Sequence, residues 1–138
     1  MSESNKAVVR QFLQALGSGD AEALDRLVTD DVAAVCTGSS LLAGTRGKAE
    51  VCGAAGMLKQ ITQSGIDFRV LQLTAEDDRV SCEAEGLSTL VTGQTYNNQY
   101  HFLFTLRGGK ISGLREYMDS LLVETVLGPI VRSAAQPG

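Results

Sequence analysis

The chain has 138 residues, 43% of them hydrophobic, and a formal net charge of -4. This length suits one hydrophobic core and is short for two ordinary domains, and scattered Lys and Arg residues give no basic surface for nucleic acid. No apolar run approaches the roughly 18 residues of a membrane span, and the N-terminus lacks the layout of a signal peptide. We therefore expect a cytoplasmic protein that binds neither nucleic acid nor membranes.

Metal chemistry is also not expected. Cys36, Cys52 and Cys82 are widely spaced, and the chain has a single His. This set lacks the paired spacing of zinc ligands, so free buried thiols are the simpler interpretation. The sequence suggests no metal and no cofactor.

The N-terminal region predicts two helices. Between residues 5 and 16 the apolar side chains recur at helical spacing, and Gly17 is suited to end that helix. Asp20 is suited to cap a short second helix that ends near Val28. A short apolar run, VAAVCTG, then has the length of a strand.

A third helix is predicted over roughly residues 48–63, with Thr45 as its cap. Its apolar positions share one face, which predicts that this face is buried. Gly53 and Gly56 lie inside it, where glycine costs about 1 kcal/mol relative to alanine. We therefore expect close packing of this helix against another backbone.

After Gly65 the pattern changes to strands separated by the short turns EDD, TG and GG. Four segments have strand character: IDFRVLQLT, RVSCEAEGLSTLV, TYNNQYHFLFTLR and KISGLREYMD. Three helices followed by an antiparallel meander predict an α+β fold, in which the helices cover one face of a curved sheet and a pocket forms between the layers. The final segment, residues 129–138, carries both prolines and is expected to be a flexible tail after a single domain of residues 1–128.

Strand alternation assigns side chains to faces. The aromatic Tyr100 and Phe102 mark one face as the core, which places His101 opposite, and Glu116 and Arg115 must also point in opposite directions. On the second strand, one face carries Glu83, Glu85 and Leu87. Both faces of these strands contain apolar residues, so alternation leaves open whether the glutamates lie in water or in the pocket.

The sequence resembles SnoaL-like members of the nuclear transport factor two-like superfamily. The segments that carry the resemblance are AVVRQFLQALGSGDAEALDRLVTDDV, AGTRGKAEV and EAEGLSTLVTGQTYNNQYHFLFTLRGGKISGLREYMD, which span most of residues 6–119. The resemblance implies the cone-shaped, cystatin-like fold shared by ketosteroid isomerase, limonene-1,2-epoxide hydrolase and small polyketide cyclases.

The catalytic positions of these relatives are filled differently here. The resemblance places Phe12, Cys36 and Tyr100 at the three ketosteroid isomerase positions, and it leaves Tyr100 as a candidate hydrogen-bond donor to an oxyanion. It places Glu85 and Glu116 at the two Asp positions of limonene epoxide hydrolase, and Glu83 at its Arg position. It further implies that Glu85, Tyr100 and Glu116 line the cone.

These inferences predict an enzyme in which pocket carboxylates act as general acid and base. Glu85 and Glu116 are the proposed pair, with Glu83 and Tyr100 beside them, because desolvation and repulsion keep one carboxyl protonated. The reaction would be an isomerisation, epoxide opening, dehydration or cyclisation of an apolar terpenoid, steroid-like or polyketide molecule. Its pocket is expected to be lined by Phe12, Leu13, Leu16, Cys36, Leu58, Leu87, Asn98, Phe102, Leu114 and Met118.

Two further expectations concern partners. A non-catalytic module that binds apolar ligands or subunits is the alternative, because fold alone does not separate these classes. The outer sheet face, with Arg115, Tyr117 and His101, is the expected interface of a homodimer.

Overall fold

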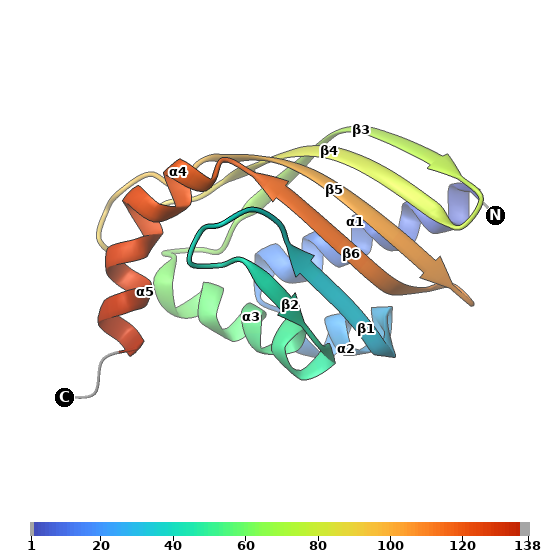
Figure 1. Cartoon of the computed structure of the whole chain (residues 1–138), viewed down its shortest axis with the longest axis horizontal. Helices are drawn as coiled ribbons and strands as arrows, with labels where there is room; N and C mark the ends of the chain where they lie inside the picture. The colour runs from blue at the N-terminus through green and yellow to red at the C-terminus, as the bar shows by residue number, and fades with distance from the viewer. Residues whose placement is uncertain (1, 136–138) are drawn as a thin grey trace.

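The structure is a computed structural model, and it describes residues 2–135. A curved six-stranded sheet has the strand order β2-β1-β6-β5-β4-β3. The N-terminal helices lie against its concave side, and the C-terminal helices stand at one end (Figure 1). The strands are β1 (Val28–Cys36), β2 (Gly44–Arg46), β3 (Asp67–Glu76), β4 (Arg79–Leu87), β5 (Asn98–Arg107) and β6 (Lys110–Met118). The predicted α+β fold, with helices on one face of a curved sheet, is confirmed.

The first two helices follow the sequence pattern. Helix α1 (Ser2–Ser18) buries Val9, Phe12 and Leu13 against the sheet. The prediction that Gly17 ends this helix is wrong, because Gly17 lies in its last turn and the residue with positive φ is Gly19, at +76°. Helix α2 (Ala21–Leu27) begins after Asp20, whose carboxylate accepts a hydrogen bond from the Ala23 N–H at 3.1 Å. The predicted cap is therefore confirmed.

Helix α3 (Lys48–Ile61) differs from expectation in two respects. Gly47 is its N-cap, and the Glu50 carboxylate accepts a hydrogen bond from the Gly47 N–H at 3.1 Å, whereas Thr45 belongs to β2. A Cβ added at Gly53 or Gly56 would meet no atom within 4 Å, so the predicted close packing is wrong.

The close backbone approach lies elsewhere, between the end of α1 and the segment before β3. The Ile66 N–H donates to the Gly17 carbonyl at 2.9 Å. A Cβ at Gly17 would collide with the Ile66 carbonyl, so only glycine fits without a shift of backbone.

The hairpins hold the core side of the sheet in register. Tyr100 lies opposite Ala84, and Phe102 lies opposite Cys82, so these residues share the concave face. The turn at Gly108 and Gly109, both with positive φ, connects β5 to β6 as predicted. Phe12 of α1 packs edge-on against Phe104 of β5, with ring centroids 5.6 Å apart.

One pairing in the sheet is parallel. Strand β1 lies beside β6 with Cys36 next to Glu116, so the sheet is mixed rather than a pure antiparallel meander. The Thr37 hydroxyl donates to the Glu116 carbonyl at 2.7 Å, across a separation of 79 positions in the sequence. This pairing brings the N-terminal half of the chain to the end of the last strand.

The C-terminal segment is helical. It forms α4 (Ser120–Leu122), the π-helical η1 (Val123–Leu127) and α5 (Gly128–Ala135). The predicted flexible tail is wrong for residues 129–135, because Pro129 occupies the first turn of α5, where proline is tolerated. Residues 136–138 lie outside the described residues. No helix within residues 2–135 is long and apolar enough to cross a membrane.

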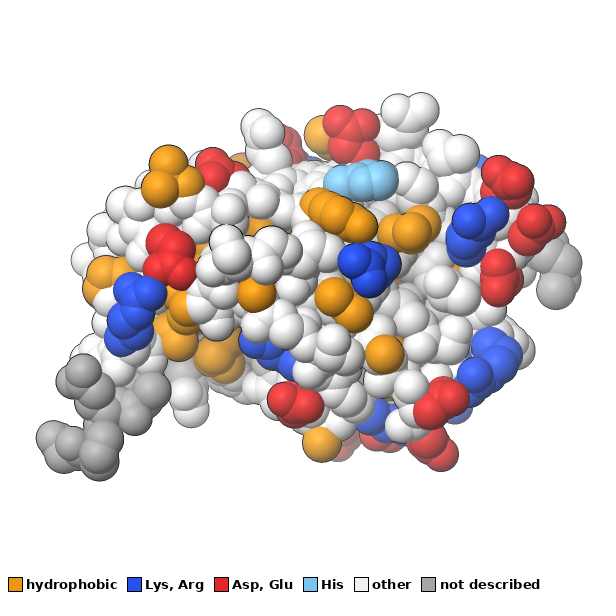
Figure 2. Space-filling view, in the orientation of Figure 1, with side chains coloured by type: hydrophobic (Ala, Val, Ile, Leu, Met, Phe, Trp, Pro, Cys, Tyr) orange, Lys and Arg blue, Asp and Glu red, His pale blue; other side chains and the backbone are white. Residues whose placement is uncertain are grey.

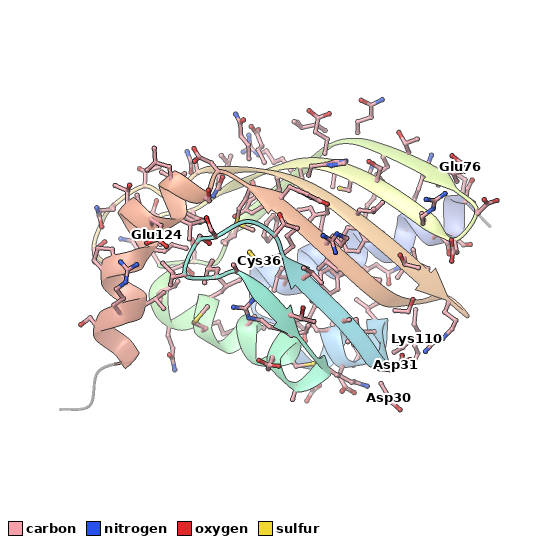
Figure 3. The ribbon with its side chains drawn as sticks, in the orientation of Figure 1. Asp30, Asp31, Cys36, Glu76, Lys110 and Glu124 are labelled. Atoms are coloured by element: carbon pink, nitrogen blue, oxygen red, sulfur yellow. The ribbon has the colours of Figure 1, made fainter. Side chains whose placement is uncertain are left out.

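Glu124 fastens this segment to the loop after β1. Its carboxylate accepts hydrogen bonds from the Leu41 N–H at 2.6 Å and from Arg132 at 2.6 Å. Figure 3 places Glu124 between the C-terminal helices and that loop. The helices and the loop together close one end of the space beneath the sheet.

Candidate active site

A cavity of about 500 Å³ lies between the concave face of the sheet and the helices. Such a volume lies within the usual range of ligand pockets, about 300–1,000 Å³. Its walls are mainly apolar, and a few polar side chains face it. The polar and ionisable ones come from six parts of the chain: Cys36, Arg46, Glu50, Tyr96, Tyr100 and Glu116.

Glu116 is the carboxyl group at the centre of this site. It faces inward on β6 next to Leu114 and Met118, and the side chain is half-buried because it opens on the cavity. Burial raises the pKa of Glu116 from 4.5 to about 7, against a smaller opposite effect of the Arg46 cation. Its carboxyl forms no hydrogen bond or ion pair with another described residue. Glu116 is therefore both a proton donor and a proton acceptor near neutral pH.

Two tyrosines place hydroxyl groups in the same cavity. Tyr100 stacks on Phe102 with ring centroids 5.1 Å apart, which fixes its ring. Burial, and next the neighbouring Tyr96 phenol, raise the pKa of Tyr100 well above 10. The Asn98 side-chain amide donates to the Tyr96 hydroxyl at 3.0 Å. The phenol of Tyr100 therefore keeps its proton and can donate a hydrogen bond.

Cys36 is the third group near Glu116. Its Cα lies beside that of Glu116 across the parallel strand pair, so the two side chains share the inner face. Burial, and next the Glu116 carboxylate, raise the pKa of the Cys36 thiol. Cys36 therefore contributes a neutral part of the cavity wall rather than a nucleophile, and Figure 3 labels it at the end of β1.

The structure separates the predicted site residues into two groups. Some line the cavity: Phe12, Leu16, Cys36, Leu58, Tyr100, Leu114, Glu116 and Met118. Leu13 and Phe102 instead lie in the packed core, where α1 meets the sheet, and neither lines the cavity. Asn98 is also buried, but its side chain bonds Tyr96 and the backbone of Asp119 rather than facing the cavity. These three act through packing and support.

The prediction that Glu83, Glu85 and Leu87 line the pocket is wrong. Glu83 lies opposite His101 and Glu85 opposite Gln99, and cross-strand partners point to the same side of a sheet. Because Tyr100 and Phe102 point inward, these residues of β4 point outward. Glu85 cannot therefore pair with Glu116 inside the cavity, whereas His101 is confirmed on the outer face.

Sequence reasoning missed Arg46 and Tyr96. Arg46 reaches the cavity because the short strand β2 pairs with β1, with Arg46 opposite Ala34. Tyr96 reaches it from the connection between β4 and β5, where its N–H donates to the Ser88 carbonyl at 2.9 Å. The Tyr in TYNN is an aromatic residue in a polar turn segment, and that signal could have marked it as buried.

The arrangement is suited to proton transfer. It combines one carboxyl group of pKa about 7 with a phenol donor in an apolar enclosure. Within residues 2–135, no group of three or more His, Cys, Asp or Glu side chains could hold a metal ion.

Solved structures of similar fold cover nearly the whole chain. PrhC from Penicillium brasilianum NBRC 6234 has a TM-score of 0.84 at 16% identity, with 97% of this chain and 92% of that chain covered. An LEH-like epoxide hydrolase of M. tuberculosis has a TM-score of 0.73 at 17% identity, with 96% of each chain covered. IdmH from Streptomyces antibioticus, a proposed polyketide cyclase, has a TM-score of 0.73 at 17% identity, with 90% and 98% covered. No curated protein sequence matches the chain significantly.

A curved sheet over three helices, with a cavity between them, is the architecture of the nuclear transport factor two-like proteins, and structures described as NTF2-like share this fold. Within that class, the family model of the SnoaL-like domain matches residues 9–114. The chain belongs to the SnoaL-like family.

Proposed function

We propose that the protein is an enzyme that transfers protons on an apolar, carbonyl-containing small molecule. The observation that carries the proposal is the Glu116 carboxyl, which faces an apolar cavity and has a pKa of about 7. A general base works best when its pKa lies near the working pH, because the correct protonation state and the driving force are then both available. With a pKa of about 7, Glu116 is present in both its protonated and its ionised form near neutral pH.

The chemistry needs one base and one oxygen-binding group. The Glu116 carboxylate removes a proton from a carbon next to a carbonyl, and the electron pair moves onto the carbonyl oxygen. The Tyr100 hydroxyl donates a hydrogen bond to that oxygen as negative charge develops. Glu116 then returns the proton to another carbon, which gives an isomerisation. Alternatively the carbanion attacks a second carbonyl of the same molecule, and Glu116 returns the proton to the alkoxide that forms there, which gives a cyclisation.

This scheme replaces the expected pair of carboxylates. Because Glu85 lies on the outer face, epoxide opening by water has no second carboxylate there to activate the water. Glu50 also lines the cavity, but it is exposed, and one of its oxygens accepts the hydrogen bond from Gly47. Isomerisation and cyclisation are therefore favoured over epoxide opening and dehydration. The relatives named as an epoxide hydrolase and a proposed polyketide cyclase support enzymatic use of this fold.

The proposal is tested by hydrogen exchange, which requires only the first step of the reaction. A panel of apolar cyclic ketones is incubated with the protein in D₂O, and loss of the α-proton signal is followed by NMR. We expect exchange that depends on the protein, with a rate that rises with pH and levels off above about pH 7 as Glu116 ionises.

Variants separate the roles. Glu116→Gln should lower the exchange rate by about 100-fold or more, and Tyr100→Phe by about 10- to 100-fold. The matched control is Glu85→Gln, which makes the same chemical change on the outer face of the sheet and should leave the rate unchanged. Exchange that persists in Glu116→Gln would refute the role of Glu116.

A non-catalytic ligand-binding module is the second candidate. It is favoured by the position of Glu85, because the predicted pair of carboxylates is not assembled in the cavity. Under this alternative, the ketones bind wild-type protein and Glu116→Gln equally well, and neither accelerates exchange. Cytoplasmic location and a homodimer through the outer sheet face remain predictions. Figure 2 shows hydrophobic and cationic side chains near the histidine on that face.

A further inference from the structure

The cavity contains one positive charge. Among the described residues that line it, Arg46 is the only cation. It lies at the end of β2, opposite Ala34 of β1, and the side chain is half-buried. Partial burial in a mainly apolar enclosure removes some of the water that would otherwise solvate a guanidinium group.

Arg46 has no carboxylate partner at contact distance. None of the ion pairs among residues 2–135 includes it, so no carboxylate oxygen of those residues lies within 4.0 Å of its guanidinium nitrogens. Neither of the two carboxyl groups that line the cavity forms an ion pair with Arg46. Glu50 bonds the Gly47 N–H, and Glu116 interacts with Arg46 only at longer range.

We propose that Arg46 binds the anionic group of an otherwise apolar substrate, such as a carboxylate or an ionised enol. A guanidinium group with five N–H donors in a planar fork is well suited to both oxygens of a carboxylate. The inference rests on the proposed function, because it specifies which molecules the cavity accepts, but binding can be measured without turnover.

The strand pairing of the sheet determines the distance between Arg46 and Glu116, the residue proposed to transfer the proton. Arg46 pairs with Ala34, which pairs with Leu114, and Glu116 lies two residues further along β6. Two strand spacings across the sheet and two residues along it place the Cα atoms of Arg46 and Glu116 about 12 Å apart. Their side chains both face the cavity, so one ring system can span from the anion site to Glu116.

Binding of an anion should also change the protonation of Glu116. The Arg46 cation favours the charged form of Glu116, and a bound anion would offset that effect and add a negative charge nearby. The other titratable groups facing this part of the cavity are the Cys36 thiol, the Tyr96 and Tyr100 hydroxyls and the Glu50 carboxylate. The thiol and both phenols have raised pKa values and stay neutral near pH 7. Anion binding at pH 7 should therefore take up protons.

The test compares matched ligands that differ only in charge. Isothermal titration calorimetry gives the Kd of 2-naphthoate and of its amide, 2-naphthamide. The same measurement is made for a smaller acid and amide built on cyclohexane, and for a larger acid and amide built on a fused-ring system. For at least one pair, wild-type protein should bind the acid about 10-fold more tightly than the amide. Titrations in buffers of different ionisation enthalpy should show net proton uptake with the acid.

Variants assign the preference to Arg46. Arg46→Gln should abolish the preference for the acid and leave the Kd of the amide unchanged, whereas Arg46→Lys should keep part of it. The matched control is Arg115→Gln, because Arg115 is exposed on the outer face of the same sheet and should not affect either ligand. Circular dichroism shows whether each variant is folded, and the wild-type comparison does not depend on any variant.

Two results would overturn the inference. One is a wild-type protein that binds no acid more tightly than its amide, including a protein that binds none of the pairs. The other is a preference that survives in folded Arg46→Gln. Glu116→Gln distinguishes this inference from the proposed function, because it should keep the preference for the acid even though proton exchange is lost.

Discussion

Replacement of Glu116 by Gln should stabilise the protein at high pH and have little effect at low pH. The pKa of Glu116 is about 7 in the folded protein and 4.5 in an unfolded chain. Folding therefore favours the protonated form, so this group's contribution to stability is fully present below about pH 4.5 and is lost as pH rises through about 7. Gln resembles the neutral carboxyl and does not titrate.

The magnitude follows from the two pKa values. They differ by about 2.5, and each pKa unit corresponds to about 1.4 kcal/mol, so the ionised Glu116 lowers the free energy of unfolding by about 3 kcal/mol. This is an upper estimate, because water that enters the cavity solvates the carboxylate. At about pH 8.5 Glu116→Gln should be more stable than wild type by about 2–3 kcal/mol, and at about pH 4.5 the two should differ by less than about 1 kcal/mol.

Urea denaturation followed by circular dichroism measures these free energies at a series of pH values. The control is Glu85→Gln, which removes a carboxylate from the outer face of the same sheet and should give a small difference that does not follow the same trend. If the free energy of unfolding of Glu116→Gln exceeds that of wild type by the same amount at both ends of the pH series, then Glu116 is not held in an apolar environment and the reasoning fails.

Three further predictions concern a helix, the C-terminal contact and the cavity cation. Gly56→Ala should raise the free energy of unfolding by about 1 kcal/mol, because the added Cβ meets open space in α3. Gly17→Ala should lower it, because the added Cβ collides with the Ile66 carbonyl, and urea denaturation compares the two variants. Glu124→Gln should lower stability at neutral pH, with the difference shrinking as the pH falls, because the paired carboxylate has a lowered pKa. An equal loss of stability in acid, measured by urea denaturation, would contradict this. Arg46→Gln should raise the pKa of Glu116, measured by carboxyl ¹³C NMR, and an unchanged value would show that the two do not interact.

The fold was predictable because, over most of the chain, the helix, cap and turn patterns of the sequence agree with the elements that the whole fold requires. The helical spacing of α1, the Asp20 cap and the Gly108 turn each appear in the structure where the sequence predicts them. The parallel pairing of β1 with β6 has no local signal, because it joins segments that are far apart in the chain. The helix η1 also escaped prediction, because its side chains become buried only against helix α3, the loops after β1 and β4, and the end of β6.

The site was predictable only in part. Glu116 and Tyr100 line the cavity, as the family resemblance implied, whereas strand alternation alone left the face of Glu116 open. Glu85 was assigned by resemblance, against the simpler pattern in which Cys82 and Ala84 are the apolar residues of β4. The strand register agrees with the simpler pattern: Cys82 and Ala84 face inward, because they lie opposite Phe102 and Tyr100 of β5.

The pairing of β1 with β6 also has a consequence for how the protein folds. The hairpins of β3 to β6 join neighbouring segments, whereas Cys36 meets Glu116 only when the chain closes a loop of about 80 residues. Contacts of such long range are slow to form, because chain entropy is lost before the contact is gained. The wall around Glu116 should therefore be completed late in folding, so the rise of its pKa toward 7 would report the arrival of the native state.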